Sequence, residues 1–104
     1  MGDVLKANTL TDLHEIINKN DRVVIDFAAP AWCVPCQRLE PHFKKAAESS
    51  DATFVEVDMD KADDGIKNTY PIMSVPMVFY VQKDAETREI KGRTALAILR
   101  EIEE

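Results

Sequence analysis

Two thiols stand three residues apart in the segment Trp32-Cys33-Val34-Pro35-Cys36, and they are the only cysteines of the 104-residue chain. At this spacing they can close and reopen a small disulfide ring, exchanging electrons with another dithiol. They could also supply half of a metal or iron–sulfur site, with a second chain completing it across a dimer. The segment therefore predicts either redox chemistry or metal binding, and residues elsewhere in the chain have to decide between these two functions.

The residue order within this segment assigns different roles to the two thiols. A cysteine attacks as its thiolate, and the N-terminus of a helix stabilises negative charge through its free N–H groups. Pro35 is favoured in the first turn of a helix, so a helix is predicted to begin here. Cys33 is then the exposed attacking thiol, and Cys36, one turn further in, is the shielded thiol that resolves a mixed disulfide.

One acid stands in an apolar segment upstream. In the segment 22–29, the residues after Arg22 are apolar on both faces except for Asp26, which predicts a central strand covered on each side by helices. Burying an unpaired charge costs several kcal/mol, so burial should raise the pKa of Asp26. Asp26 is therefore a candidate acceptor for the proton of Cys36 near neutral pH. The alternative is a structural carboxyl that is hydrogen-bonded locally.

Hydrophobic periodicity and turn residues predict the elements that hold these groups in the order β-α-β-α-β-α-β-β-α. Strands are expected at 4–6, 22–29, 52–59, 77–81 and 87–91, and helices at 10–17, 37–49, within 60–70 and at 95–102. Alternation of strands and helices gives parallel pairs, and a hairpin through 83–86 adds antiparallel ones. The chain length fits a single α/β domain, 1–104, with a mixed sheet.

Composition excludes several classes of partner. The formal net charge of −6 disfavours binding to nucleic acid, whose phosphates would be repelled. No apolar segment reaches the roughly 20 residues that span a bilayer, and the N-terminus lacks the plan of a secretory signal. We expect solvated positions, without a metal, for two histidines and four acids: His14, His42, Asp58, Asp60, Asp63 and Asp64.

Taken together, these motifs resemble the thioredoxin family over nearly the whole chain. The specific feature is the W-C-x-P-C form with a buried acid upstream and a proline loop downstream at family-like spacing. The matching segments are 24–27, 32–36, Pro41, 55–60, 70–76 and Gly92. The resemblance implies a thioredoxin fold, in which a central five-stranded mixed β-sheet is flanked by four α-helices.

The resemblance also implies site roles. Cys33 is the nucleophile, Cys36 the resolving thiol and Asp26 the buried acid–base group. Base rates favour a trans Val75–Pro76 bond, whereas the resemblance implies a cis-proline packed against the disulfide. An extended substrate segment is expected to pair along the loop in the strand-addition mode. The residues expected to contact it are Trp32, Val34, Pro35, Val75, Pro76 and Gly92.

The chain departs from the family pattern at several positions. Val34 stands where the family usually has Gly, and about 30 mV of potential corresponds to only about 1.4 kcal/mol, so the potential is open to change. One extra residue separates Asp26 from Trp32. Glu40 and Glu56 occupy positions near the buried acid where family members often carry a Lys. Without that cation, Asp26 is expected to be harder to ionise.

The resulting hypothesis is a thiol–disulfide oxidoreductase that reduces protein disulfides. By resemblance we expect a flavin-dependent reductase as electron donor, no cofactor or metal besides the Cys33–Cys36 disulfide, a monomer and a cytoplasmic location. Two alternatives stay open: a thioredoxin-fold adaptor in which the thiols are incidental, and the metal or iron–sulfur site shared across a dimer.

Overall fold

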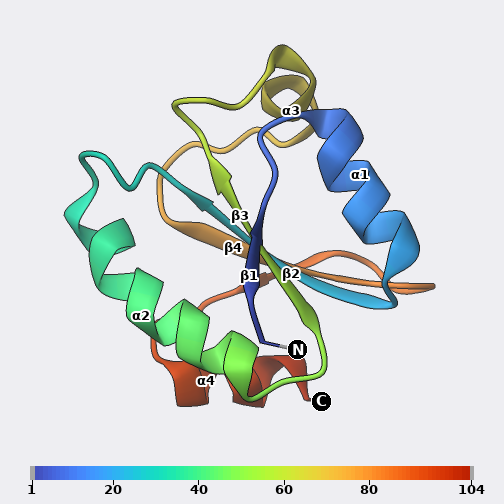
Figure 1. The fold of residues 1–104 in the computed structure, drawn as a ribbon, viewed down its shortest axis with the longest axis vertical. Coiled ribbons are helices and arrows are strands. Elements are labelled where there is room, and N and C mark those ends of the chain that lie inside the picture. Colours follow the sequence, from blue (N-terminus) through green and yellow to red (C-terminus); the bar gives the residue numbers. More distant parts are fainter. Residues whose placement is uncertain (1, 104) are drawn as a thin grey trace.

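The computed structural model describes residues 2–103, so the first and last residues of the predicted domain 1–104 lie outside it. Its strands are β1 (Val4–Lys6), β2 (Arg22–Ala28), β3 (Thr53–Asp58), β4 (Met77–Gln82) and β5 (Arg88–Ile90). Its helices are α1 (Leu10–Lys19), α2 (Val34–Glu48), α3 (Asp64–Thr69) and α4 (Ala95–Ile102). The strands form one mixed sheet in the order β1-β3-β2-β4-β5, which confirms the predicted fold class (Figure 1).

The direction of β4 positions the functional residues. β2 runs parallel to β3, as the alternating pattern predicts, but β4 is antiparallel to β2, with Phe27 opposite Met77. The connection from β3 through α3 stays at the end of the sheet where β3 finishes, instead of returning along it (Figure 1). β4 therefore starts beside the end of β2, and the segments that follow Ala28 and precede Met77 meet at one edge.

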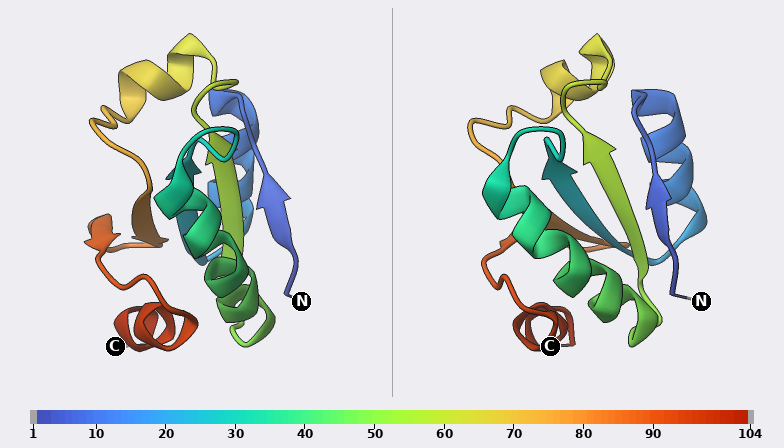
Figure 2. Two further views of the ribbon diagram at one scale, coloured as in Figure 1. Left: turned by 90° about the vertical axis from the view of Figure 1, so that its left-hand side faces the viewer. Right: turned by 60° about the vertical axis from the view of Figure 1, so that its left-hand side comes forward.

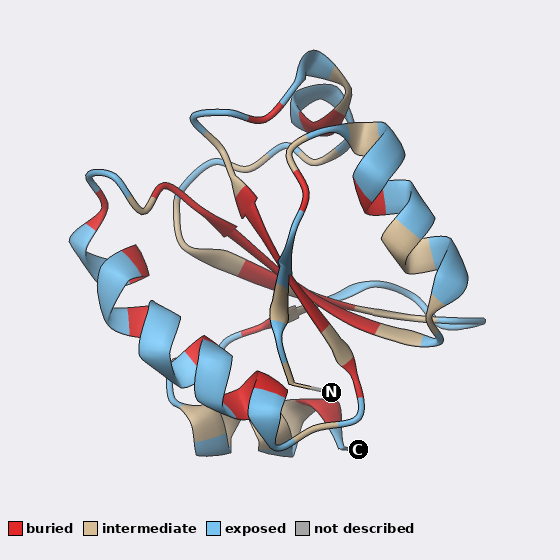
Figure 3. Cartoon of the chain, in the orientation of Figure 1, coloured by how far each residue is buried: buried red, intermediate tan, exposed pale blue. Residues whose placement is uncertain are grey.

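Helices cover both faces of the sheet, as the doubly apolar strand β2 requires. α2 and α4 pack on one face, while α1 and α3 pack on the other (Figures 1 and 2). Val24 points into the first core and Val23 and Ile25 into the second, all fully buried, in keeping with side chains that alternate along a strand. Figure 3 shows the central strands as the most buried part of the molecule.

Polar side chains start the helices. Thr9, Asp63 and Thr94 each accept a hydrogen bond from the backbone N–H three residues later, at 3.1, 2.9 and 3.2 Å. Asp63 also accepts from the backbone N–H of Leu10 at 3.2 Å, which ties α3 to α1. None of the described helices is both long and apolar enough to cross a membrane.

Candidate active site

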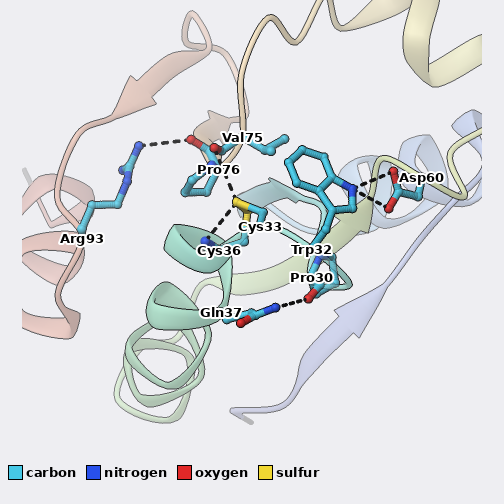
Figure 4. The surroundings of a disulfide bond; sticks show 9 residues. All are labelled: Pro30, Trp32, Cys33, Cys36, Gln37, Asp60, Val75, Pro76 and Arg93. Carbon is cyan, nitrogen blue, oxygen red and sulfur yellow. Dashed lines mark hydrogen bonds between the residues drawn. A yellow bond between two sulfur atoms is a disulfide. The ribbon is translucent and has the colours of Figure 1, made fainter.

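The two cysteines lie where β2 ends and α2 begins. Cys33 and Cys36 form a disulfide with their Cα atoms 5.2 Å apart (Figure 4). Cys33 is the N-cap of α2, and its Sγ accepts a hydrogen bond from the backbone N–H of Cys36 at 3.2 Å. The helix starts at Val34, so Pro35 lies in its first turn, as predicted, where no N–H donor is needed. The helix thus includes three residues before the range 37–49 that hydrophobic periodicity predicts.

Cys33 was predicted to be exposed and Cys36 to be shielded, and the prediction for Cys33 was wrong. Cys33 is 4% exposed and Cys36 is 2% exposed, so both are buried. Cys33 is buried because it packs against Ala28, Ala29 and the partly buried Val75. The two sulfurs differ instead in position, since Cys33 caps the helix while Cys36 belongs to its first turn.

The loop before β4 lies against the disulfide. The Val75–Pro76 peptide bond is cis, as the family resemblance implies and against the base-rate expectation. The carbonyl oxygen of Val75 lies 3.7 Å from Sγ of Cys33. Figure 4 shows Val75 and Pro76 directly beside the disulfide. A main-chain carbonyl is thus presented next to the sulfur of Cys33.

Trp32 has a polar partner that the sequence did not suggest. Its indole Nε1–H donates to Asp60, at 3.0 Å to Oδ2 and 3.3 Å to Oδ1 (Figure 4). The ring stays 64% exposed, and Val34 beside it is 50% exposed. Asp60 is exposed, as predicted for an acid of a solvated face, and it also holds the Trp32 ring in place beside the disulfide. The ends of β2 and β3 are neighbours, which brings the two residues together.

Asp26 is buried in the middle of β2, as predicted. It is 1% exposed, and its Oδ1 has no hydrogen-bond partner among the described residues. Burial, followed by the nearby negative charge of Glu56, raises the pKa of Asp26 to about 7. Asp26 lines a cavity of about 460 Å³ together with Glu40, which lies one helical turn after Cys36. The carboxyl therefore reaches space under the helix that carries Cys36.

A lysine is present near this acid, but on another strand than the resemblance suggests. Glu56 lies opposite Asp26 in the β2–β3 register and opposite Lys6 in the β1–β3 register. Lys6 Nζ donates to Glu56 Oε1 at 2.5 Å, and this bond raises the pKa of Lys6. The cation thus neutralises Glu56 instead of Asp26. Sequence reasoning missed Lys6 because the residue belongs to a three-residue edge strand, 50 positions before its partner.

The remaining positions that the resemblance implies have mixed settings. Pro35 and Pro76 line a common cavity beside the disulfide. At Gly92 a Cβ atom would lie 2.6 Å from Cβ of Ala97, so the absence of a side chain there lets α4 pack closely. Among residues 2–103 no group of three or more His, Cys, Asp or Glu side chains is arranged to hold a metal ion.

Comparison with known proteins decides the family. The model of the family described as Thioredoxin matches residues 4–104. The chain belongs to the thioredoxin family. It is 39% identical over 90 residues to the thioredoxin of Mycoplasma genitalium, which covers 86% of each chain. With its Cys33–Cys36 disulfide, it is a thiol–disulfide oxidoreductase.

Solved thioredoxin structures have the same fold. A mutant thioredoxin from Halobacterium salinarum superposes with a TM-score of 0.86 at 30% identity, covering 98% of this chain and 89% of that one. The oxidised mitochondrial thioredoxin 3 from Saccharomyces cerevisiae gives a TM-score of 0.82 at 30% identity, covering 96% and 93%. The thioredoxin-fold prediction is therefore confirmed, including the mixed sheet and its four flanking helices.

Proposed function

We propose that this chain reduces protein disulfides, with Cys33 as the attacking thiol and Cys36 as the resolving thiol. The observation that carries this proposal is the position of Cys33 as the N-cap of α2, with the Cys36 N–H 3.2 Å from its sulfur. A backbone donor at this distance stabilises a thiolate on Cys33 when the disulfide is open. The sulfur of Cys36 has no such cap position.

The reaction proceeds by two thiol–disulfide exchanges. The thiolate of Cys33 attacks one sulfur of the substrate disulfide; a mixed disulfide forms and one substrate thiolate leaves and takes up a proton. Cys36 then loses its proton, and its thiolate attacks the sulfur of Cys33. The mixed disulfide breaks, the Cys33–Cys36 disulfide forms and the second substrate thiolate is released. Two electrons have moved from the protein to the substrate.

Asp26 is the proposed acceptor for the proton of Cys36. A group with a pKa of about 7 is close to half ionised at neutral pH, so it can both accept and return a proton. Two observations support this role: Oδ1 of Asp26 has no hydrogen-bond partner among the described residues, and Asp26 lines a cavity with Glu40, which lies one helical turn after Cys36. The negative charges of Glu56 and Glu40 raise the pKa of this carboxyl.

The proposed substrate surface surrounds the disulfide. An extended substrate segment pairs with the backbone at Val75, whose carbonyl lies beside Cys33, as in strand addition. The exposed rings and apolar side chains next to it supply nonpolar contacts. The residues assigned to this surface are Trp32, Val34, Pro35, Val75, Pro76 and Gly92.

Family membership supports the remaining parts of the proposal. The electron donor is a reductase that reopens the Cys33–Cys36 disulfide, and the substrates are proteins with accessible disulfides. We place the protein in the cytoplasm as a monomer formed by one domain, 1–104; the family match over residues 4–104 supports the domain assignment. No metal or cofactor takes part in the scheme.

Trapping experiments test the two cysteine roles. In Cys36→Ser, the mixed disulfide on Cys33 should persist, because the resolving thiolate is absent. Reduced variant mixed with a disulfide-bonded peptide should therefore gain the mass of one peptide arm, read by mass spectrometry without reductant. Cys33→Ser is the matched control and should accumulate little adduct. An adduct on Cys33→Ser but not on Cys36→Ser would reverse the assignment.

A double variant tests the adaptor alternative. Replacing both cysteines by Ser removes the redox reaction but leaves the substrate surface. If the protein acts as an oxidoreductase, the double variant loses its cellular activity, measured by complementation of a strain that lacks the protein. Full complementation by the double variant would instead favour binding as the function.

A further inference from the structure

A cationic hollow lies beside the disulfide, next to the proline loop. Its volume is about 270 Å³, and its lining residues are Pro35, Arg38, Leu39, His42, Pro76 and Arg93. Two of these are prolines of the proposed substrate surface, so the hollow continues that surface. The other polar lining residues are two arginines and a histidine, and the described lining includes no carboxylate. We refer to these six residues as the cationic hollow.

Two elements hold these side chains in place. Arg38 and His42 are four residues apart on α2 and both are exposed, so they share one face of the helix. Arg93 approaches from the segment before α4; its Nη1 donates to the carbonyl oxygens of Ile90 at 2.9 Å and Gly92 at 3.0 Å. Its Nη2 donates to Pro76 O at 3.5 Å, which fixes the guanidinium against the loop.

The arginines of the hollow have no carboxylate in direct contact within the described chain. Arg93 acts on the buried Asp26 only at longer range, where its charge lowers the pKa of that carboxyl. Neither Arg38 nor Arg93 forms an ion pair among residues 2–103. The carboxylate of Glu101 is instead bound by the backbone N–H groups of Lys91 and Gly92, at 3.1 and 2.6 Å. A protein with a net charge of −6 thus keeps two unpaired arginines beside its reactive disulfide.

The opposite side of the disulfide carries a negative charge. Figure 4 shows Arg93 reaching the loop from one side of Cys33, while Trp32 and Asp60 lie on the other. Asp60 is bound to the Trp32 indole, so its negative charge stays on that side. The charges beside the disulfide are therefore asymmetric, positive on the side of Arg93 and negative on the side of Asp60.

We propose that the cationic hollow binds a carboxylate of the substrate, supplied by an Asp or Glu within about three residues of the cysteine that Cys33 attacks. This inference rests on the proposed function and adds a preference for acidic disulfide segments to it. An extended segment rises about 3.3 Å per residue, so about three residues reach from the cysteine to a side pocket that shares Pro35 and Pro76 with the site. Guanidinium groups bind carboxylates through paired, charge-assisted hydrogen bonds.

Matched peptides test the inference. A series of disulfide-bonded peptides carries Glu or Gln at each of the three positions on either side of one cysteine. The measurement is the second-order rate constant for oxidation of the fully reduced protein by each peptide at low ionic strength. We expect the Glu peptide to react about threefold to fivefold faster than its Gln partner at the best position. Salt at about 1 M should reduce this ratio, because it screens exposed charges.

Without the hollow, the opposite order is expected, because the net charge of −6 repels an acidic peptide. In Arg38→Gln and in Arg93→Gln the Glu/Gln ratio should fall to about one or below. Lys83→Gln removes the same charge from an exposed position in the turn after β4, at the opposite end of that strand from Pro76, and should keep the wild-type ratio. The Arg38 side chain makes no hydrogen bond within the described residues, so Arg38→Gln stays informative if Arg93→Gln disturbs the loop.

Two results would overturn the inference. One is a ratio of one or less at every position in the wild-type protein, and the other is a ratio that survives in Arg38→Gln. A protein that oxidises with neither the Glu nor the Gln peptides would contradict the proposed function itself, and the inference with it. Reaction with Gln peptides at an equal rate leaves the proposed function intact and removes only the carboxylate preference.

Discussion

The protonation of Asp26 should make the stability of this protein depend on pH in a direction unusual for a carboxylate. The pKa of Asp26 is raised from 3.8 to about 7 in the folded chain, mainly by burial. The folded protein therefore holds this proton more tightly than the unfolded chain does. Unfolding releases the proton between about pH 4 and pH 7, so this group lowers the free energy of unfolding as the pH rises through that range.

The substitution Asp26→Asn removes the titration while keeping the size of the side chain. A rise of about three pKa units, at about 1.4 kcal/mol each, corresponds to about 4 kcal/mol. We expect the variant to gain about 4 kcal/mol of stability relative to wild type between about pH 3.5 and pH 8. A difference of this size moves the urea midpoint by about 2 M for a slope near 2 kcal/mol/M. The change from a carboxyl to an amide also alters the free energy of unfolding by an amount that does not depend on pH.

Urea unfolding of the oxidised proteins at a series of pH values measures this difference. Glu86→Gln is the matched control, because Glu86 is exposed and forms no hydrogen bond or ion pair among the described residues. A wild-type-to-variant difference that stays constant within about 1 kcal/mol from pH 4 to pH 8 would refute the reasoning. NMR titration of the Asp26 carboxyl carbon gives a second measurement, with a midpoint near pH 7 expected in the folded protein.

Two further predictions concern the neighbours of the site. Glu56→Gln should shift the titration midpoint of Asp26 to lower pH, because the charge of Glu56 raises the pKa of Asp26. Lys6→Gln should shift this midpoint to higher pH, because the charge of Lys6 lowers that pKa. Shifts of both variants in the same direction would contradict this electrostatic arrangement. Gly92→Ala should cost about 1–3 kcal/mol of stability, because the added Cβ would lie 2.6 Å from Cβ of Ala97. The cost should shrink in an Ala97→Gly background, which a double-mutant cycle by urea unfolding measures.

Local signals predict the parts of the site that depend on adjacent residues. The strand around Asp26 and the start of α2 follow from an apolar run and from Pro35 after Cys33, both within a few positions. Asp60 and Arg93 could not be found in this way. Their partners, Trp32 and the carbonyl of Pro76, lie 28 and 17 positions away and become neighbours only through the strand order.

The burial of Cys33 was missed for a related reason. Helix position alone predicts an exposed N-cap, since the first turn of a helix at a sheet edge normally faces water. Here β4 runs antiparallel to β2, so the loop ending at Pro76 returns over the end of β2 and covers Cys33. The direction of β4 depends on the connection through α3, and the alternating strand–helix pattern favours the parallel arrangement instead.

Two cations, Arg93 and Lys6, lower the pKa of Asp26, but neither forms an ion pair with it, and this determines how Asp26 can act. A lysine in direct contact with a buried aspartate would favour the charged form and lower its pKa. Lys6 instead binds Glu56 from the edge strand, and its side chain is 67% exposed, so water screens much of its charge. Desolvation of Asp26 is therefore the dominant effect and keeps its pKa near 7. An acid that is half ionised at neutral pH suits a proton acceptor for Cys36 better than one fully ionised by a neighbouring cation.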